Sequence, residues 1–247
     1  MKSWTIDINC DVGEGIGNEE ALFPFISSCN IACGGHAGDI KSMTEIVRLS
    51  KLHKIRVGAH PSYPDKPNFG RKIMKISASE LKQSIVDQLN TFSRVIRNED
   101  VPLHHIKAHG ALYNQTAKDE SLAEIYLEAV SEYNNGVFLY VPFGSKIANI
   151  AIKKGLKIKY EAFGDRNYND DLSLVSRKSK NALIEKPEKV LEHILPIIKE
   201  HRLFTIHGKI VQIMADTICV HSDTQTALEI LMYLSKELPF KKVQLQK

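Results

Sequence analysis

Short apolar stretches typical of β-strands recur along the 247 residues, and segments with helical periodicity separate most of them. A chain that alternates strands with helices folds into a parallel sheet with right-handed crossovers. The pattern therefore predicts an α/β fold, with a hairpin at residues 204–212 outside the main sheet. The seven expected strands are residues 5–10, 29–33, 56–60, 104–109, 137–141, 158–163 and 217–221.

Polar residues stand at or just beyond the ends of several expected strands. This position is shared by Asp11, His36, His60, His109 and His221. A closed barrel would gather them around one mouth, where the loops of such barrels bind ligands. An open, doubly wound sheet normally uses only the loops near its switch point. We therefore expect one domain over residues 1–247, a seven-stranded TIM-like (β/α) barrel.

Composition and charge limit the classes of partner. With 43% hydrophobic and 25% charged residues, the chain can bury the core of a globular domain. The net charge of +4 is small and the Lys and Arg residues are spread out, so we expect neither nucleic acid nor a membrane surface as a partner. The first residues do not resemble a signal peptide and no apolar stretch is long enough to cross a bilayer, so we expect a cytoplasmic protein.

The four cysteines lie within expected strands or at their ends. In such positions a reduced cysteine serves as a small buried apolar residue. We therefore expect no disulfide among Cys10, Cys29, Cys33 and Cys219.

The stretch 30–39 concentrates chemically active residues. An apolar run ends before the pair Gly34-Gly35, and a helical pattern begins after Asp39. His36 is therefore expected in a strand-to-helix loop at a solvent-reaching barrel mouth, where it is a catalytic candidate. Asp39 has two interpretations, the N-cap of the helix or a catalytic carboxylate.

A mixed carboxylate and imidazole site is one use of these residues. Asp11 together with His36, His60 or His109 could hold Zn²⁺ or another divalent ion. The sequence has no His-Glu-x-x-His spacing, and neutral imidazoles also serve general acid–base catalysis, so both uses stay open. The six remaining histidines are expected to be solvated or structural: His53, His104, His105, His193, His201 and His207.

Three further charged residues have two interpretations each. Glu14 lies in the glycine-rich turn 13–17, which lacks the lysine of a phosphate-binding P-loop, so it belongs to a tight turn or acts as a general base. Lys107 and Arg71 either hold a substrate carboxylate or phosphate, or form ordinary surface ion pairs.

Longer motifs reveal a family resemblance. Over nearly its whole length, the chain resembles the LamB/YcsF family. The motifs that carry this resemblance are residues 7–15, 30–39, 58–65, 69–71, 107–114, 165–168, 174–177 and 215–221.

The resemblance implies a barrel similar to those of glycoside hydrolases and polysaccharide deacetylases. It also implies one component of bacterial ATP-dependent 5-oxoprolinase, which opens the lactam ring of 5-oxo-L-proline to L-glutamate with ATP as cosubstrate and works with two further subunits, B and C. Two alternatives stay open. One is a metal-dependent amide hydrolase or carbohydrate deacetylase on the same barrel, and the other is a non-catalytic ligand-binding subunit.

The predicted site combines catalytic and substrate-binding residues near the barrel mouth, and a divalent metal there stays an open alternative. The expected catalytic residues are Asp11, Glu14, His36, His60, Lys107, His109 and His221. The expected substrate-binding residues are Asn9, Asn30, Arg71, Tyr113, Asp165, Arg166 and Asp223.

Overall fold

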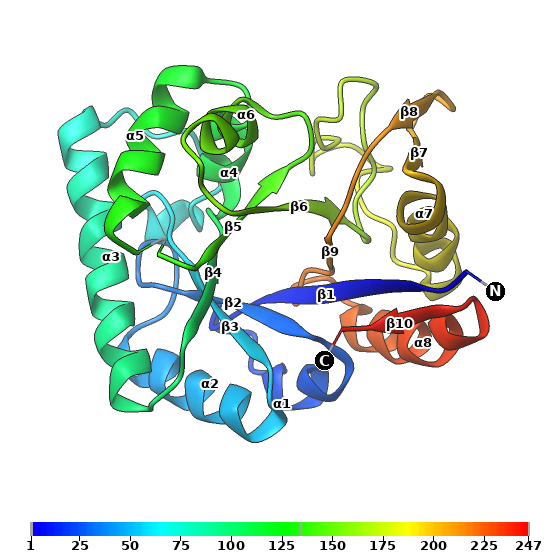
Figure 1. Cartoon of the computed structure of the whole chain (residues 1–247), viewed down its shortest axis with the longest axis horizontal. Coiled ribbons are helices and arrows are strands. Elements are labelled where there is room, and N and C mark those ends of the chain that lie inside the picture. Colours follow the sequence, from blue (N-terminus) through cyan, green and yellow to red (C-terminus); the bar gives the residue numbers. More distant parts are fainter. Residues whose placement is uncertain (1, 134, 247) are drawn as a thin grey trace.

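The computed structural model describes residues 2–133 and 135–246. Seven parallel strands form a sheet in which the last strand pairs with the first, so that the sheet closes into a barrel (Figure 1). This closure confirms the predicted fold class. In order around the barrel, the strands are β1 (Trp4–Val12), β2 (Ser28–Ala32), β3 (Arg56–His60), β4 (Leu103–Ile106), β5 (Phe138–Pro142), β6 (Ile158–Phe163) and β9 (Thr217–Cys219).

Strand β1 is long and extends beyond the barrel. Residues 7–9 pair with β9 and residues 9–12 with β2, so the second half of β1 belongs to the barrel wall. Residues 4–6 pair instead with β10 (Val243–Leu245), a parallel strand that the sequence pattern did not predict. Figure 1 shows this first half of β1, in blue, beside the red β10.

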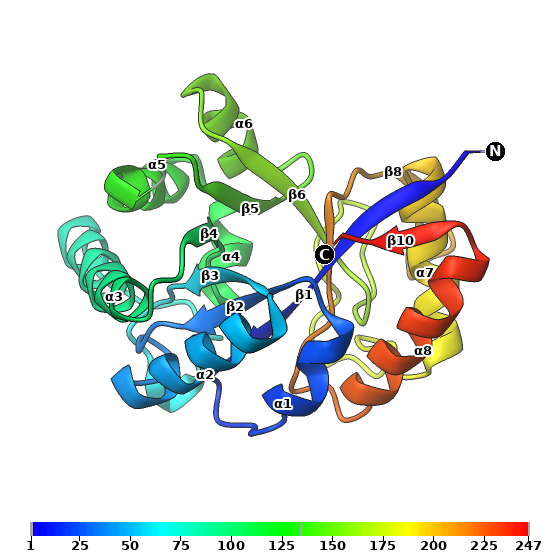
Figure 2. The ribbon, with the colours of Figure 1, turned by 60° about the horizontal axis from the view of Figure 1, so that its bottom comes forward.

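Helices cover the outside of the barrel (Figure 2). Amphipathic periodicity gives each longer helix one buried face, and neighbouring helices also pack on one another. The α-helices are α1 (Glu19–Leu22), α2 (Ile40–His53), α3 (Ala78–Asn98), α4 (Gly110–Thr116), α5 (Glu120–Val130), α6 (Lys146–Lys153), α7 (Pro187–Glu200) and α8 (Ala227–Phe240). Short 3₁₀ turns lie at Phe23–Phe25, Lys66–Asn68 and Ser131–Tyr133.

Capping boxes begin two of the long helices. The Ser42 N–H donates to the Asp39 carboxylate over 2.8 Å, and the Asp39 N–H donates to the Ser42 hydroxyl over 2.9 Å. Ser77 and Glu80 form the same reciprocal pair at the start of α3. The N-cap interpretation of Asp39 is therefore confirmed.

The connections differ in how well local sequence predicts them. The predicted hairpin is confirmed, because β7 (Arg202–Phe204) and β8 (Ile210–Gln212) form an antiparallel sheet outside the barrel. Residues 110–114 carry turn-like glycine and asparagine, yet they belong to α4. A long-range bond from the Ala111 N–H to the Gly70 carbonyl, 2.9 Å, holds the start of that helix.

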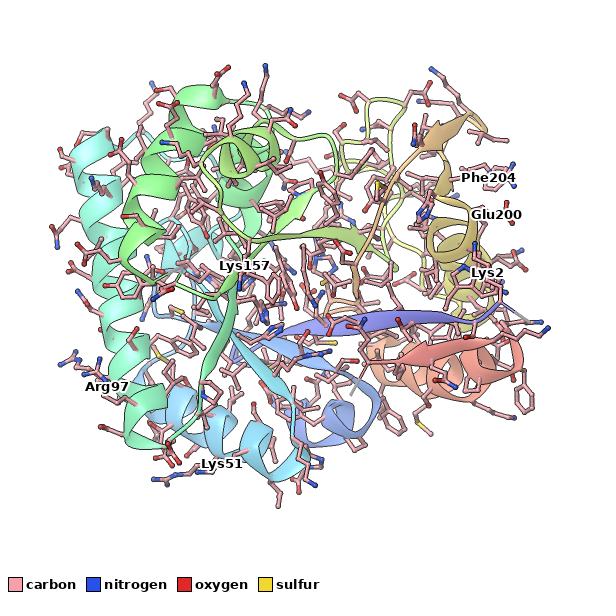
Figure 3. All side chains as sticks on the ribbon, viewed as in Figure 1. Lys2, Lys51, Arg97, Lys157, Glu200 and Phe204 are labelled. Carbon is pink, nitrogen blue, oxygen red and sulfur yellow. The ribbon has the colours of Figure 1, made fainter. Side chains whose placement is uncertain are left out.

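The core lies between the barrel wall and the helices. Apolar side chains of the strands, such as Ile8 and Val57, share it with Leu89 and Phe92 from α3. All four cysteines are buried and free, as predicted. Charged side chains such as Lys51 and Arg97 point outward from α2 and α3 (Figure 3). Within the described residues, no helix is both long enough and apolar enough to cross a membrane.

Candidate active site at the barrel mouth

A cavity of about 470 Å³ opens at the C-terminal ends of the barrel strands. The residues that line it come from the ends of β1, β3, β4, β6 and β9 and from the loops that follow them. The predicted site residues on its surface are Asp11, Glu14, His60, Arg71, Lys107, His109, Tyr113, Arg166 and His221. The predicted residues that do not line it are Asn9, Asn30, His36, Asp165 and Asp223.

Lys107 lines this cavity and forms two buried ion pairs. Its Nζ is 2.8 Å from Asp11 Oδ1 and 2.9 Å from Glu161 Oε1. Burial alone would lower the pKa of Lys107, but the charges of Asp11 and Glu161 raise it well above its ordinary value. The side chain is only 2% exposed, so the interpretation as a surface ion pair is wrong. Lys107 is a fixed positive charge next to the cavity.

A polar layer inside the barrel holds Asp11 from behind. The Asn30 amide donates to Asn9 Oδ1 and to Asp11 Oδ1, both over 2.7 Å, and Nε2 of His105 lies 2.6 Å from Asn30 Oδ1. Asn9 and Asn30 are fully buried. They lie where they orient Asp11 and do not line the cavity, so their contact with a substrate stays a prediction.

Three histidines and Glu14 form a buried cluster beside Asp11. Nε2 of His60 lies 3.0 Å from Nδ1 of His109, and Oε1 of Glu14 lies 3.3 Å from the same atom of His109. Nε2 of His36 lies 3.0 Å from Glu14 Oε1. Each of the four side chains offers one ligand atom, and these atoms all lie within 4.8 Å of one another, so the cluster can hold a metal ion.

His36 is enclosed, which corrects the expectation that it reaches solvent. Its side chain is 0% exposed. Its ring stacks on His109 with a centroid distance of 3.6 Å and meets Phe69 edge-on at 5.3 Å. Burial lowers the pKa of His36, although its hydrogen bond to Glu14 opposes that effect. His36 therefore contacts a ligand only through Glu14 or His109.

His221 also lines the cavity and forms a pair with a buried carboxylate. Its Nδ1 lies 2.9 Å from Asp165 Oδ1, so this nitrogen carries the proton and Nε2 keeps its lone pair. Asp165 also accepts from the His221 N–H over 3.1 Å and from the Thr224 hydroxyl over 2.6 Å. Burial alone would raise the pKa of Asp165, but His221 and Thr224 hold it below its ordinary value. Asp165 is thus a partner of His221 and does not line the cavity, and its contact with a substrate stays a prediction.

Cationic side chains form the outer wall of the cavity. Arg71 is 2.5 Å and Arg177 is 3.6 Å from the same Asp223 carboxylate. The surface-pair interpretation of Arg71 therefore agrees with the structure, although Arg71 and Arg177 also line the cavity. Asp223 is held between these arginines, and its predicted binding of substrate stays a prediction. Arg166 donates to the carbonyls of Val175 over 2.7 Å and Ala182 over 3.3 Å, which fixes the loop that carries Arg177.

Sequence reasoning missed several residues of the site. Glu161 had a usable signal, because a carboxylate inside the apolar stretch 158–163 indicates a side chain that points into the barrel. Phe163 stacks on His221 with a centroid distance of 5.1 Å, yet its sequence context is that of any strand end. Arg177 belongs to the motif 174–177, but the long irregular loop around it gave no basis for predicting that it lines the cavity.

Comparison with known proteins shows the family. The LamB/YcsF family model matches residues 6–247. The A subunit of 5-oxoprolinase from Pyrococcus horikoshii is 39% identical over 238 residues, 94% of this chain and 93% of that protein. The A subunit of 5-oxoprolinase from Campylobacter jejuni subsp. doylei is 40% identical over 245 residues, 97% of this chain and 96% of that protein.

Solved structures agree with this relationship. The crystal structure of the lactam utilization protein from Thermus thermophilus superposes with a TM-score of 0.90 at 34% identity, covering 98% of this chain and 99% of that one. A family 4 carbohydrate esterase from Streptomyces lividans, at 10% identity and a TM-score of 0.50, shares the fold alone and covers 99% of this chain and 92% of that one. Since the family model spans almost the whole length and these relatives match throughout, the chain belongs to the LamB/YcsF family.

Proposed function

We propose that the chain is the A subunit of an ATP-dependent 5-oxoprolinase, which opens the lactam ring of 5-oxo-L-proline to L-glutamate and hydrolyses ATP together with subunits B and C. The names of its relatives support this proposal, because two of them are the A subunit of 5-oxoprolinase and a third is a lactam utilization protein. The observation that carries it is one cavity that combines a histidine paired with a buried carboxylate and several cationic side chains.

The cationic side chains of the cavity complement the charges of 5-oxo-L-proline. 5-Oxo-L-proline carries one carboxylate, which Arg71 and Arg177 can bind through paired hydrogen bonds at the outer wall. Its lactam carbonyl gains negative charge when water adds to the ring carbon. Lys107, which is held charged by Asp11 and Glu161, is the proposed group that stabilises that charge.

ATP is required because a lactam carbonyl is a poor electrophile. Transfer of the γ-phosphoryl group to the lactam oxygen activates the ring carbon, and a first water then adds there. The ring C–N bond breaks, the nitrogen takes a proton, and γ-glutamyl phosphate is left, which a second water converts to glutamate and phosphate. His221 is the proposed proton carrier, because Asp165 fixes its Nδ1–H and leaves Nε2 free to take a proton from water.

Reconstitution with subunits B and C tests the proposal. We expect the complex to release glutamate from 5-oxoproline only when ATP is present. We expect His221→Gln to reduce kcat by about 10²–10⁴-fold, the usual contribution of a positioned acid–base group. His207→Gln, in the exposed β7–β8 turn, is the matched control and should keep full activity. A wild-type complex that releases no glutamate overturns the activity, and full activity of His221→Gln overturns the role of His221 as proton carrier. Unchanged activity after replacement of the mouth residues would support a non-catalytic binding subunit.

A second candidate function is metal-dependent hydrolysis of an amide or an acetylated sugar by this chain alone. The cluster of Glu14, His36, His60 and His109 favours it, because two or three imidazoles with one carboxylate form a known type of hydrolytic metal site. Hydrolysis by the lone chain without ATP, abolished by a chelator and restored by Zn²⁺, would support this candidate. An active preparation that contains no metal would exclude it.

A further inference from the structure

The protons of His60 and His109 are placed by two backbone carbonyls. Nδ1 of His60 lies 2.8 Å from the Lys107 carbonyl, and Nε2 of His109 lies 3.0 Å from the Phe69 carbonyl. A carbonyl oxygen only accepts, so each of these ring nitrogens carries the proton. The opposite nitrogens, Nε2 of His60 and Nδ1 of His109, therefore both present lone pairs, and they face each other at 3.0 Å. Two lone pairs at this distance repel unless a cation lies between them.

The surroundings of this nitrogen pair are negative. Oδ2 of Asp11 lies 3.4 Å from His60 Nε2, and Oε1 of Glu14 lies 3.3 Å from His109 Nδ1. Lys107 compensates Asp11, but within the described residues the ion-pair partners of Glu14 are histidines only. A buried carboxylate without a cationic partner is unfavourable. Both the lone pairs and the uncompensated Glu14 call for a positive charge at the same place.

We propose that the chain binds one divalent transition-metal ion of the Zn²⁺ type, with Nε2 of His60, Nδ1 of His109 and Oε1 of Glu14 as its protein ligands. Tetrahedral Zn²⁺ with bonds of about 2.0–2.1 Å holds its ligand atoms about 3.3 Å apart. The spacings in the cluster, 3.0 Å and 3.3 Å, are close to that value. Two imidazoles and one carboxylate also suit Zn²⁺ rather than Mg²⁺ or Ca²⁺, which prefer all-oxygen sites.

A proton shared between the two rings is the competing occupant. The Phe69 carbonyl accepts from the Nε2–H of His109 and leaves Nδ1 with a lone pair, which is the form of the ring that ligates metals. A divalent ion also accepts the lone pairs of both rings and of Glu14 at once, which one proton does not.

The neighbours of the three ligands fit the same role. Nε2 of His36 lies 3.0 Å from Glu14 Oε1 and holds the carboxylate in place, as second-layer partners of metal ligands do. The two carbonyls fix the orientation of His60 and His109 in the same way. All three ligand residues line the cavity, so a fourth coordination position faces the space where a substrate or water binds. We assign the fourth position to water, with Asp11 beside it.

A metal titration of the full chain tests the site without reference to the proposed activity. The protein is stripped with a chelator, and Co²⁺ is added as a spectroscopic substitute for Zn²⁺. We expect a single equivalent to bind, with the intense visible absorption of tetrahedral Co²⁺, and Zn²⁺ to displace it. We also expect Zn²⁺ to raise the Tm of the stripped protein, because a ligand that binds only the native state stabilises it. The proposal is overturned if the wild-type chain binds neither Co²⁺ nor Zn²⁺ at one equivalent.

Variants locate the ion. We expect His109→Gln and Glu14→Gln to weaken Co²⁺ binding by at least about 10-fold, since each removes or neutralises a ligand. His221→Gln is the control and should bind Co²⁺ as the wild type does.

This control also tests a different grouping, Asp11, Cys219 and His221, whose ligand atoms lie within 4.8 Å of one another. Loss of binding in His221→Gln with retention in His109→Gln would overturn the proposed ligand set. Because the titration contains no ATP or 5-oxoproline, its failure is distinct from failure of the proposed function.

Discussion

His36 contributes to stability as a buried ring does. Its side chain lies between His109 and Phe69 and has no exposed surface. We expect His36→Ala to lower the free energy of unfolding by about 2–4 kcal/mol, because it leaves a cavity and removes a partner of Glu14. Urea denaturation followed by circular dichroism measures this loss. Leu89→Ala, in the core face of α3, is the reference, with an expected loss of about 2–5 kcal/mol. A loss below about 0.5 kcal/mol for His36→Ala, the range of surface substitutions, would contradict its enclosure.

Asp165 makes stability depend on pH. Its pKa is lowered in the folded chain, where burial is outweighed by His221 and Thr224, so its ionised form stabilises the fold above the unfolded pKa of about 3.9. That contribution is lost as pH falls through the lower, folded pKa. We therefore expect Asp165→Asn to cost about 1–3 kcal/mol at pH 7 and progressively less as the pH falls below about 4.

Unfolding of the wild type and of Asp165→Asn at neutral and acidic pH measures how the cost of the substitution depends on pH. Asp87→Asn, on the exposed face of α3, is the matched control and should change stability by less than about 0.5 kcal/mol at either pH. A cost of Asp165→Asn that stays constant into acid would show that its carboxylate is not stabilised by His221.

Single residues of the site were predictable in position but not in environment. The strand ends placed Asp11, His60 and His109 at the mouth, because parallel strands point the same way. Whether each side chain meets solvent, a carbonyl or another ring depends on neighbours far along the chain. The Phe69 carbonyl that orients His109 is one such neighbour.

At the scale of elements, the segment between β6 and α7 forms part of the cavity wall. Its backbone is held by isolated bridges between Arg166 and Leu183 and between Tyr168 and Leu174. The Arg166 guanidinium adds bonds to the carbonyls of Val175 and Ala182. A lysine ammonium at this position cannot span both carbonyls, because it lacks the planar fork of the guanidinium.

We expect Arg166→Lys to loosen this segment and to expose Arg177 and Lys178 to trypsin. The rate of the first cleavage, followed by mass spectrometry on the native protein, should rise several-fold relative to wild type, because proteolysis follows local opening. Arg202→Lys, at an exposed position of β7, is the matched control and should leave that rate unchanged. Equal rates for Arg166→Lys and wild type would show that the bridges alone hold the segment.

Periodicity found the strands and long helices but missed two elements. Strand β10 has only three residues and forms because β1 extends past the barrel to pair with it. Helix α4 begins at Gly110, whose φ of 57° is typical of a turn, and the Gly70 carbonyl accepts from the Ala111 N–H. Both depend on long-range pairing, which local patterns do not contain.

At the scale of the whole molecule, the barrel differs from one filled with branched apolar side chains. Its interior contains Asp7, Asn9, Asn30 and His105, all buried and hydrogen-bonded. The sequence showed these residues on strands, and the closed barrel places them in one connected layer beneath the mouth. The family and the barrel could therefore be predicted from the chain, whereas the layer required the register of neighbouring strands, such as the pairing of Asp11 with Asn30.

The whole chain contributes one part of the proposed reaction, and we expect it to show no 5-oxoprolinase activity alone. The turn 13–17 lacks the lysine of a P-loop, and the cavity pairs histidines and carboxylates with arginines rather than with a recognised nucleotide motif. Relatives are named as one subunit of an enzyme, which agrees with a site completed by partners. Glutamate release should therefore appear only when subunits B and C and ATP are added to the purified chain. Omission of the purified chain from a mixture that contains subunits B and C and ATP should also abolish glutamate release. Full ATP-dependent turnover by this chain alone, with partner contamination excluded by mass spectrometry, would show that it binds and uses ATP itself.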